Sequence, residues 1–393
     1  MYHRIRGIAK GGGPLTSAPG RVAMIAGSAT LEGTTRYRER FRDRAAAGHF
    51  REVRGLWLSS IGLGTYLGEA DAATDEAYEE AILAGLAAGS NVIDTAVNYR
   101  HQRSERAVGR ALARAFRERG VRRDEVFVAT KGGFLPFDGD LPGDPRRFLQ
   151  ETYLASGLLQ ADDLAGGVHA MSPGFLADQL ERSRRNLGLA TLDLYYLHNP
   201  ETQLGDLPRE RFRERLREAV GALEGAVREG KAAGWGIATW DGLRAGPRAP
   251  EHLSLAEVAE IAAQVARGSR SGRFMAVQLP FNLAMPEALA SPSQPYQGAT
   301  VPALVAARAL GLAVFTSASL LQGRLAGGLP DEIAAAFPEP RTDAQRALQF
   351  ARSAPGVTVA LVGASQAEHV RENLELAAIP PADPAAFQRL FLP

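Results

Sequence analysis

A strand–helix–strand unit spans LWLSSIGLG (residues 56–64), TDEAYEEAILAGLAAG (residues 74–89) and NVID (residues 91–94). In the middle segment apolar residues recur at the spacing of one helix face, and Gly89 is a residue type that ends helices. The flanking runs are largely apolar without alternation, which is typical of strands buried on both faces of a parallel sheet. The unit therefore predicts parallel strands joined by helices.

The same alternation continues towards the C-terminal end of the chain. In total we predict eight strand–helix units in about 320 residues, which fits a (β/α)8 TIM barrel. A doubly wound open sheet is the less favoured alternative. The further strands are predicted at residues 126–131, 192–198, 234–239, 275–278, 312–316 and 357–362.

Several helices are predicted to begin at a serine or threonine. A helix is expected to open at Ser172, before Pro173. Three others carry the capping-box pattern, in which Glu or Gln follows Ser or Thr by three residues. These pairs are Ser254 with Glu257, Thr342 with Gln345, and Ser365 with Glu368, the last opening the final helix.

The domain organisation predicted is an N-terminal arm, residues 1–54, followed by the barrel, residues 55–393. The arm holds 11 basic and 4 acidic residues. We expect it to pack on or near the barrel; a nucleic-acid-binding arm is less favoured, because acidic residues interrupt the basic run and aromatic residues are sparse. A long insertion at residues 133–171 and a shorter one at 320–341 follow strands, so we expect both on the catalytic face.

Composition excludes several classes of protein. The chain has 393 residues, 45% of them hydrophobic and 23% charged, which suits a folded protein with a full core. It has no cysteine, which excludes disulfides, thiolate nucleophiles and cysteine-bound metals. The net charge of +1 gives no signature of nucleic-acid binding. No targeting or transmembrane segment stands out, so we expect a soluble, cytoplasmic protein that binds no membrane.

Four chemically useful side chains are predicted at or just after strand ends. Asp94 ends the second strand and Tyr99 follows five residues later, Lys131 ends the third strand, and His198 ends the fourth. In a barrel the carboxyl ends of the strands meet on one face. A carboxylate, a phenol, an ammonium and an imidazole are therefore expected to converge.

This set is suited to proton transfer by a phenol. A free tyrosine has a pKa near 10, and a neighbouring ammonium lowers the pKa of a phenol. Asp94 would keep the Lys131 ammonium charged and oriented, and His198 would position a carbonyl oxygen against Tyr99. Only three of 45 basic residues are lysines, so a lysine at position 131 is notable. We expect no metal at this site.

A redox role requires a cofactor, because no side chain donates hydride. Two later segments suit phosphate groups. The turn at residues 317–323 is small and polar, and Ser365 is predicted at a helix N-terminus directly after the last strand. Phosphate sites of barrels often use the loops after the seventh and eighth strands.

Several short stretches form an ordered set along the chain. The most specific is D-T-A-V-N-Y at residues 94–99, followed by S-E at 104–105 and Gly109. The other stretches are G-L-G-T-Y at 62–66, Lys131, D-L-Y-Y-L-H-N-P at 193–200, Gln278, and G-A-S…E-N at 363–373. On these stretches the chain resembles the aldo/keto reductase family over about residues 55–380.

The resemblance implies reversible hydride transfer between NAD(P)H and an aldehyde or ketone. Tyr99 would be the proton donor, Lys131 and Asp94 would tune it, and His198 would orient the substrate. Tyr66 and Phe134, with His198, are the expected substrate-binding residues. The implied cofactor-binding residues are Gly64, Thr65, Thr239, Gln278, Ser317, Ser319, Leu320, Gln322, Gly363, Ser365, His369, Glu372 and Asn373.

Three positions depart from the family pattern. Ser317 stands where an aromatic residue usually stacks on nicotinamide, and the segment before Thr239 lacks the usual serine. Gly363 and His369 replace the basic residues that many members carry near the adenosine phosphate. NADP(H) is the preferred cofactor and NAD(H) the alternative.

A small-molecule carbonyl or alcohol is the expected partner, and the sequence indicates no oligomeric state. The alternative function is a regulatory or redox-sensing barrel that binds the nicotinamide cofactor but has little steady-state turnover.

Overall fold

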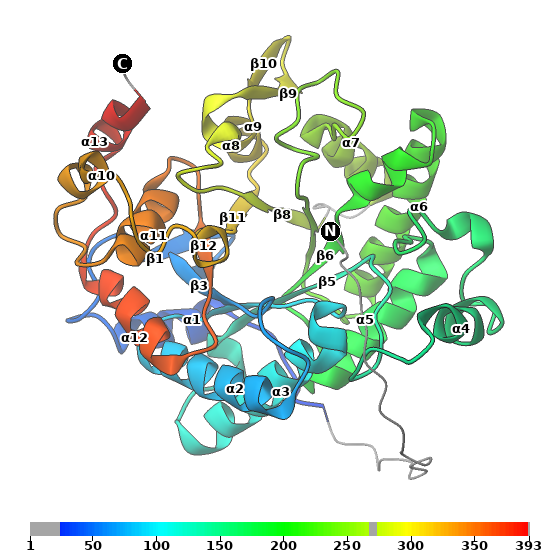
Figure 1. Ribbon diagram of the computed structural model, residues 1–393, viewed down its shortest axis with the longest axis horizontal. Coiled ribbons are helices and arrows are strands. Elements are labelled where there is room, and N and C mark those ends of the chain that lie inside the picture. The colour runs from blue at the N-terminus through cyan, green and yellow to red at the C-terminus, as the bar shows by residue number, and fades with distance from the viewer. Residues whose placement is uncertain (1–23, 267–272, 392–393) are drawn as a thin grey trace.

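A closed barrel of eight parallel strands forms the centre of the computed structural model, which describes residues 24–266 and 273–391. The strand order is β11-β12-β3-β4-β5-β6-β7-β8, and pairing of β8 with β11 closes the barrel (Figure 1). This confirms the predicted (β/α)8 fold. The barrel strands are β3 (Ile61–Gly64), β4 (Val92–Asp94), β5 (Phe127–Gly132), β6 (Leu194–His198), β7 (Trp235–Ala238), β8 (Phe274–Pro280), β11 (Ala313–Ser317) and β12 (Val359–Gly363).

A helix follows each barrel strand and covers the outside of the barrel (Figure 1). These helices are α2 (Ala72–Ala87), α3 (Arg103–Glu118), α5 (Pro173–Leu187), α6 (Arg209–Arg228), α7 (Leu255–Val265), α9 (Ala303–Ala309), α11 (Asp343–Ser353) and α12 (Ala367–Leu374). Shorter elements are α1 (Leu31–Glu39), α4 (Pro145–Leu149), α8 (Glu287–Ala290), α10 (Asp331–Ala336), α13 (Pro384–Gln388), the 3₁₀ turns η1 (Tyr99–Gln102), η2 (Arg123–Glu125), η4 (Ala161–Asp163), η5 (Pro200–Gly205), η6 (Leu321–Gly323), η7 (Glu375–Ala378) and η8 (Arg389–Phe391), and the π turn η3 (Gln150–Leu154).

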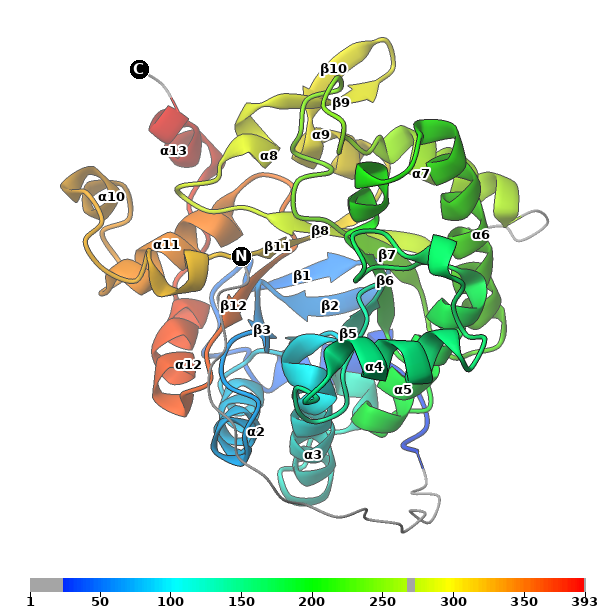
Figure 2. The same ribbon diagram turned by 45° about the vertical axis from the view of Figure 1, so that its right-hand side comes forward.

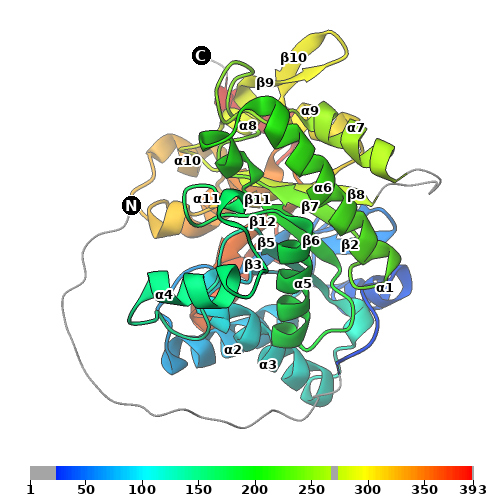
Figure 3. The same ribbon diagram turned by 90° about the vertical axis from the view of Figure 1, so that its right-hand side faces the viewer.

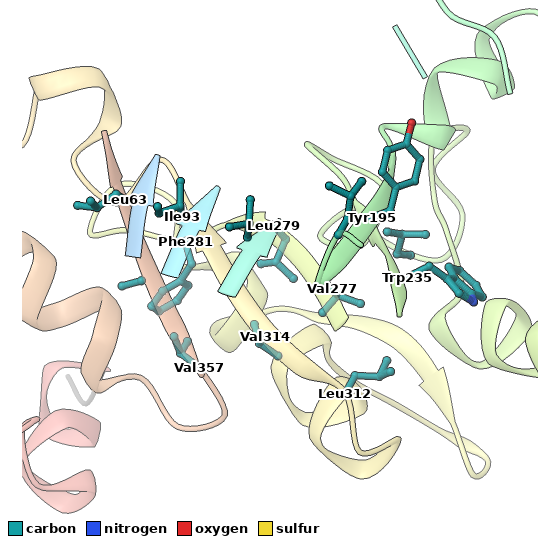
Figure 4. Close-up of a cluster of buried hydrophobic side chains, with 14 of the residues drawn as sticks. Leu63, Ile93, Tyr195, Trp235, Val277, Leu279, Phe281, Leu312, Val314 and Val357 are labelled. Atoms are coloured by element: carbon teal, nitrogen blue, oxygen red, sulfur yellow. The ribbon is translucent and has the colours of Figure 1, made fainter. Parts of the chain in front are cut away.

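Successive residues of each barrel strand face opposite sides, because side chains alternate along a strand. One apolar cluster contains Val92, Phe127 and Ala129, which fill the barrel interior. A second cluster contains Ile93 and Val277, which lie between the strands and the helices (Figure 4). Both faces are therefore apolar, which explains why the sequence shows no alternation in these strands.

The predicted first strand, residues 56–64, is wrong as a single element. It is two strands, β2 (Leu56–Ser59) and β3, separated at Ser60. β2 pairs with β1 (Phe50–Val53) in an antiparallel hairpin outside the barrel. Positive φ angles at Arg54 (51°) and Gly55 (80°) form the tight turn that such a hairpin requires. The run is apolar on both sides of Ser59 and Ser60, so it was predicted as one strand across the break.

The hairpin and α1 lie at one side of the molecule, and α4 lies on the other (Figure 3). Leu58 of β2 packs in the interior cluster, so the hairpin covers the end of the barrel where its strands begin. Within the predicted arm, α1 is capped by Thr30 and packs against η2 and β2. Residues 1–23 of that arm lie outside the described residues.

Two segments beyond the strand–helix pattern contain structure of their own. The insertion at residues 133–171 holds α4 and η3 around a small apolar cluster that includes Tyr153 and Phe175. After α8, strands β9 (Pro292–Tyr296) and β10 (Ala299–Pro302) form a projecting hairpin (Figure 2). The sequence did not predict this hairpin, because two prolines in β9 weaken the strand signal.

The capping predictions have mixed outcomes. Both halves of the predicted box form at Thr342 and Gln345. Ser254 accepts the Glu257 N–H as predicted, whereas the Glu257 carboxylate pairs with Arg213. Ser172 stands at the N-cap of α5, although its side chain makes no capping hydrogen bond.

The box predicted at Ser365 is wrong. Helix α12 begins at Ala367, and Gln366 is its N-cap residue without a side-chain cap. Strand β12 extends to Gly363, and the chain uses residues 364–366 to turn back before the helix starts. A further helix, α13, follows α12, so α12 is also not the final helix.

Among the described helices, none combines the length and the apolar character that crossing a membrane requires.

Candidate active site

Strand register brings three polar side chains to one level inside the barrel. On β4, Asp94 points inward like Val92, and on β5, Lys131 points inward like Ala129. Gln278 on β8 is paired in register with Ala238 of β7. All three residues are at least 95% buried. The barrel therefore carries a polar layer immediately above its apolar interior, at the carboxyl ends of the strands.

Asp94 and Lys131 form a buried ion pair. The Lys131 Nζ lies 2.5 Å from Asp94 Oδ1 and donates to the Thr95 carbonyl oxygen at 2.9 Å. Gln278 Nε2 donates to the other carboxylate oxygen of Asp94 at 2.8 Å. Because a buried charge is costly without partners, these contacts fix the ammonium in one place.

Tyr99 lies next to this ion pair, as the sequence predicted. Its hydroxyl oxygen is 3.4 Å from Lys131 Nζ, and the ammonium is 4.9 Å from the ring centroid. The Tyr99 ring makes edge contacts with Tyr66 (centroids 5.0 Å apart) and His198 (5.9 Å). The structure therefore brings together all four predicted catalytic residues.

The turn after Tyr99 has an unusual backbone that charged residues hold in place. Arg100 and His101 have positive φ angles of 47° and 57°. The Arg100 guanidinium pairs with Asp75 of α2 and donates to the Glu69 carbonyl oxygen at 2.8 Å. Such left-handed residues persist only where the surroundings stabilise them, and they gather at functional sites. The sequence did not predict this support.

The electrostatics of the site differ in one respect from the prediction. Burial raises the pKa of Tyr99 above its ordinary value, and the Lys131 ammonium opposes this shift without reversing it. The lysine acts in the predicted direction, but the net acidification of the phenol was predicted wrongly, because sequence alone gives no measure of burial.

The ion pair itself has raised pKa values on both partners. Burial raises the pKa of Asp94, against the opposing effect of Lys131. For Lys131, burial acts to lower the pKa, but Asp94 and Tyr99 together raise it, so the ammonium stays charged. His198 differs, because burial and the nearby Lys131 charge hold its pKa well below the ordinary value. Its imidazole is therefore neutral at neutral pH.

A cavity of about 520 Å³ opens above this layer. Lys131 lies behind the cavity wall, in contact with Asp94 and Tyr99. The predicted site residues that line the cavity are Gly64, Thr65, Tyr66, Asp94, Tyr99, Phe134, His198, Thr239, Gln278, Ser317, Ser319, Leu320, Gln322 and Gly363. The lining residues that sequence reasoning missed are Leu67, Asn98, Asn199, Ala238, Trp240, Ala318, Gly323 and Leu361.

Four predicted cofactor residues lie outside this cavity: Ser365, His369, Glu372 and Asn373. The Glu372 carboxylate accepts a hydrogen bond from the Thr342 hydroxyl at 2.8 Å, and Asn373 is buried. The structure therefore groups these residues at α12, apart from the catalytic four.

Several polar atoms of cavity-lining residues are buried and have no hydrogen-bond partner among the described residues. They are Asn98 Oδ1, His198 Nδ1, Thr239 Oγ1 and Ser319 Oγ. Buried polar atoms normally have partners, so such a group marks a place where a ligand can supply them. The polar and backbone-rich lining on the β7–β12 side fits a cofactor with several hydrogen-bonding groups.

The loop after β11, residues 317–323, borders the cavity on that side. Ala318, Leu321 and Gln322 all have positive φ angles, and Asn282 Nδ2 donates to the Ala318 carbonyl oxygen at 2.9 Å. Three left-handed residues in one loop cost conformational energy. This loop is therefore held in a specific shape against the cavity.

Glu201 supports the backbone at Trp240, which forms part of the cavity wall. The sequence did not predict this role of Glu201. Its carboxylate accepts the backbone N–H of Trp240 at 2.7 Å and that of Asp241 at 3.3 Å, and its Oε2 has no partner in the described part of the chain. Trp240 lines the cavity with 43% of its surface exposed. Burial raises the pKa of Glu201 from 4.5 to about 7.

Substituting Glu201 with glutamine should change how stability depends on pH. The pKa is higher in the folded state, so the wild type loses stability as the pH rises from the unfolded value of 4.5 through the folded value of about 7. Glutamine does not titrate. The free energy of unfolding of Glu201→Gln, relative to wild type, should therefore rise by about 3 kcal/mol between pH 4.5 and about pH 8.

Urea unfolding at both pH values measures this difference. The exposed Glu210 provides a control, since Glu210→Gln should keep a nearly constant difference from wild type. A constant difference for Glu201→Gln as well would contradict the expected ionisation of Glu201.

No group of three or more His, Asp or Glu side chains in the described part of the chain is arranged to hold a metal ion.

Comparison with known proteins places this geometry in a family. The model of the aldo/keto reductase family matches residues 60–263, more than half of the chain. An aldo-keto reductase of Mycobacterium avium is 33% identical over 132 residues, which are 34% of this chain and 32% of the relative. One of Mycolicibacterium vanbaalenii is 35% identical over 147 residues, 37% of this chain and 36% of the relative. The matched segments thus span about a third of these relatives.

Solved structures resemble a larger part of the chain. An aldo/keto reductase of Klebsiella pneumoniae, in complex with NADP and acetate, is 26% identical with a TM-score of 0.56, covering 88% of this chain and 96% of that one. The glycerol dehydrogenase AKR11B4 of Gluconobacter oxydans has a TM-score of 0.60 at 19% identity, and the match covers 88% of this chain and 94% of that one. At this identity the match shows a similar fold. With its closed barrel and the family match over residues 60–263, the chain belongs to the aldo/keto reductase family.

Proposed function

We propose that this protein is an oxidoreductase that catalyses reversible hydride transfer between NADPH and an aldehyde or ketone. The observation that supports it most strongly is the Tyr99 hydroxyl, 3.4 Å from the buried Lys131 ammonium and bordering the cavity. A phenol beside a fixed cation can release and regain a proton, and a carbonyl that accepts hydride needs that proton.

A bound reduced nicotinamide would supply the hydride. Tyr99 donates its proton to the carbonyl oxygen, and the Lys131 ammonium stabilises the phenolate that remains. Asp94 keeps that ammonium charged and in place. His198 is neutral, so it orients the carbonyl oxygen by a hydrogen bond without giving up a proton. The proton therefore comes from the phenol of Tyr99. In alcohol oxidation the Tyr99 phenolate accepts the proton instead.

The cofactor would occupy the β7–β12 side of the cavity, where unpartnered polar atoms of Thr239 and Ser319 are found. Gln278 and Ser317 would contact the nicotinamide end, and the loop at residues 317–323 the pyrophosphate. Ser365, His369, Glu372 and Asn373, on or next to α12, would contact the adenosine end. Tyr66 and Phe134 would contact the substrate.

NADP(H) is preferred over NAD(H) in this proposal. The Klebsiella pneumoniae relative was solved with NADP. In this chain, Arg324 follows the cavity-lining Gly323 and Arg371 lies on α12, and both side chains are exposed. Either guanidinium can pair with a 2′-phosphate, which NAD(H) lacks.

Steady-state oxidation of NADPH and NADH with a panel of aldehydes, ketones and sugars tests this proposal. We expect turnover with at least one carbonyl class and a higher kcat/KM for NADPH. Absence of turnover across the panel in both directions, with bound NADPH oxidised only once per protein molecule and slow release, would favour the redox-sensing alternative.

A further inference from the structure

A second histidine, His169, lies behind the candidate catalytic histidine and is fully buried. It stands near the end of the insertion at residues 133–171 and does not line the cavity. Its Nε2 lies 2.7 Å from the carbonyl oxygen of His198, the last residue of β6. His169 therefore connects the insertion to the strand end that carries His198.

Neighbouring groups determine which nitrogen of His169 carries the proton. Gln203 Nε2 lies 3.0 Å from His169 Nδ1 and also donates to the His169 carbonyl oxygen at 3.1 Å. The Gln203 Oε1 accepts from Arg215 at 2.8 Å, which leaves the amide nitrogen of Gln203 as the donor. Nδ1 of His169 is thus an acceptor, so Nε2 bears the proton and donates it to the His198 carbonyl oxygen.

The surroundings keep this imidazole neutral and closely packed. Burial lowers the pKa of His169 to about 4. Gly133, with φ of +147°, lies close to the hydrogen bond between His169 and His198. A Cβ atom at this position would lie 2.7 Å from the His198 carbonyl oxygen and 2.8 Å from His169 Nε2. Glycine is therefore required at this position for the contact to form.

The same imidazole also contacts a cavity-lining ring. Phe134 packs edge-on against His169, with centroids 5.1 Å apart, and against His198, with centroids 5.0 Å apart. Backbone pairing between residues 134 and 169 and the Ala170 N–H bond to the Gly133 carbonyl oxygen (2.9 Å) hold this arrangement. One buried side chain thus supports both the imidazole and the phenyl ring that face the substrate region.

We propose that His169 is a positioning residue, which fixes the end of β6 and the Phe134 ring so that His198 meets the substrate carbonyl. This inference rests on the proposed function and extends it to a residue outside the cavity. Because the contacts of His169 lie on the side of β6 and Phe134, its loss should affect the carbonyl substrate and spare the cofactor.

A pair of amide substitutions separates the two contacts of His169. The amide nitrogen of glutamine reaches the place of Nε2, so His169→Gln keeps the donor to His198. The shorter asparagine reaches only the place of Nδ1, so His169→Asn keeps the Gln203 contact and loses that donor. We expect kcat/KM for the carbonyl to fall about 100-fold in His169→Asn, with NADPH affinity within about twofold of wild type, and most activity to return in His169→Gln.

Val168→Ala is the matched control, because Val168 is the exposed neighbour outside the cavity. It should leave kcat/KM unchanged. Equal kcat/KM in wild type and His169→Asn would overturn the proposal. So would an equal loss of activity, NADPH affinity and melting temperature in both amide variants, since that pattern describes a purely structural role.

Nitrogen-15 NMR of the histidine rings gives a readout that requires no turnover. In the wild type we expect His169 as the Nε2-protonated form with no titration between about pH 5 and about pH 9, and a His198 resonance that moves in His169→Asn but not in His169→Gln. Titration of His169 near its ordinary pKa of about 6.5, or an unmoved His198, would refute the positioning role. Lack of carbonyl turnover in the wild type would refute the proposed function alone.

Discussion

Replacing Tyr99 with phenylalanine should lower kcat for carbonyl reduction about 10³-fold, because general acid catalysis contributes roughly that factor. The substitution removes only the hydroxyl that lies 3.4 Å from Lys131. The ring contacts with Tyr66 and His198 can remain, so the shape of the cavity is kept. NADPH affinity, measured by fluorescence titration, should stay within about twofold of wild type.

Tyr296→Phe is the matched control, since it removes a phenol hydroxyl from the β9–β10 hairpin, away from the cavity. Its kcat should equal that of the wild type. Retention of wild-type turnover in Tyr99→Phe would show that another group donates the proton. A parallel loss of NADPH affinity would show that Tyr99 acts in binding.

The catalytic layer could be located from sequence because two simple rules combine. Parallel strands of a barrel end at one face, and inward side chains recur at every second residue. Asp94 and Lys131 each end such an inward series, so their meeting follows once the strands are placed. His198 ends an inward series on β6 in the same way, whereas Tyr99 lies in η1, beyond the end of β4. The structure brings all four together. Their roles in catalysis remain predictions.

Features that depend on burial and on tertiary contacts could not be predicted in this way. Desolvation of the Tyr99 hydroxyl outweighs the Lys131 charge, and sequence carries no measure of it. Glu201 and His169 act through backbone atoms of other segments, at Trp240 and His198. Contacts from a side chain to a distant main-chain atom leave no spacing pattern in the sequence. The division of the predicted first strand at Ser60 could not be predicted either, because β2 and β3 on its two sides are both apolar.

Replacing Lys131 with methionine should shift the pH dependence of alcohol oxidation. In the proposed mechanism alcohol oxidation needs the Tyr99 phenolate, and Lys131 is the group that lowers the Tyr99 pKa against the effect of burial. Without the ammonium that pKa rises further, so the ascending limb of the kcat profile should move about 1–3 pH units towards alkali. At about pH 8 the rate would then fall at least about 10-fold.

The same substitution also leaves the Asp94 carboxylate buried without its cation, which should destabilise the fold by about 3 kcal/mol. The double variant Lys131→Met/Asp94→Asn removes that charge, and the side-chain oxygen of the introduced asparagine can still accept from Gln278. Its stability should recover while part of the displacement of the pH limb remains. The phenol still lacks its cation, but the loss of the Asp94 charge, which itself raises the Tyr99 pKa, moves the limb partly back. Lys231→Met, at a half-buried lysine paired with Glu181 and Glu229, should leave the profile unchanged. If the limb returned to its wild-type position together with stability, Lys131 would be a structural partner of Asp94 and the phenol would be tuned by other groups.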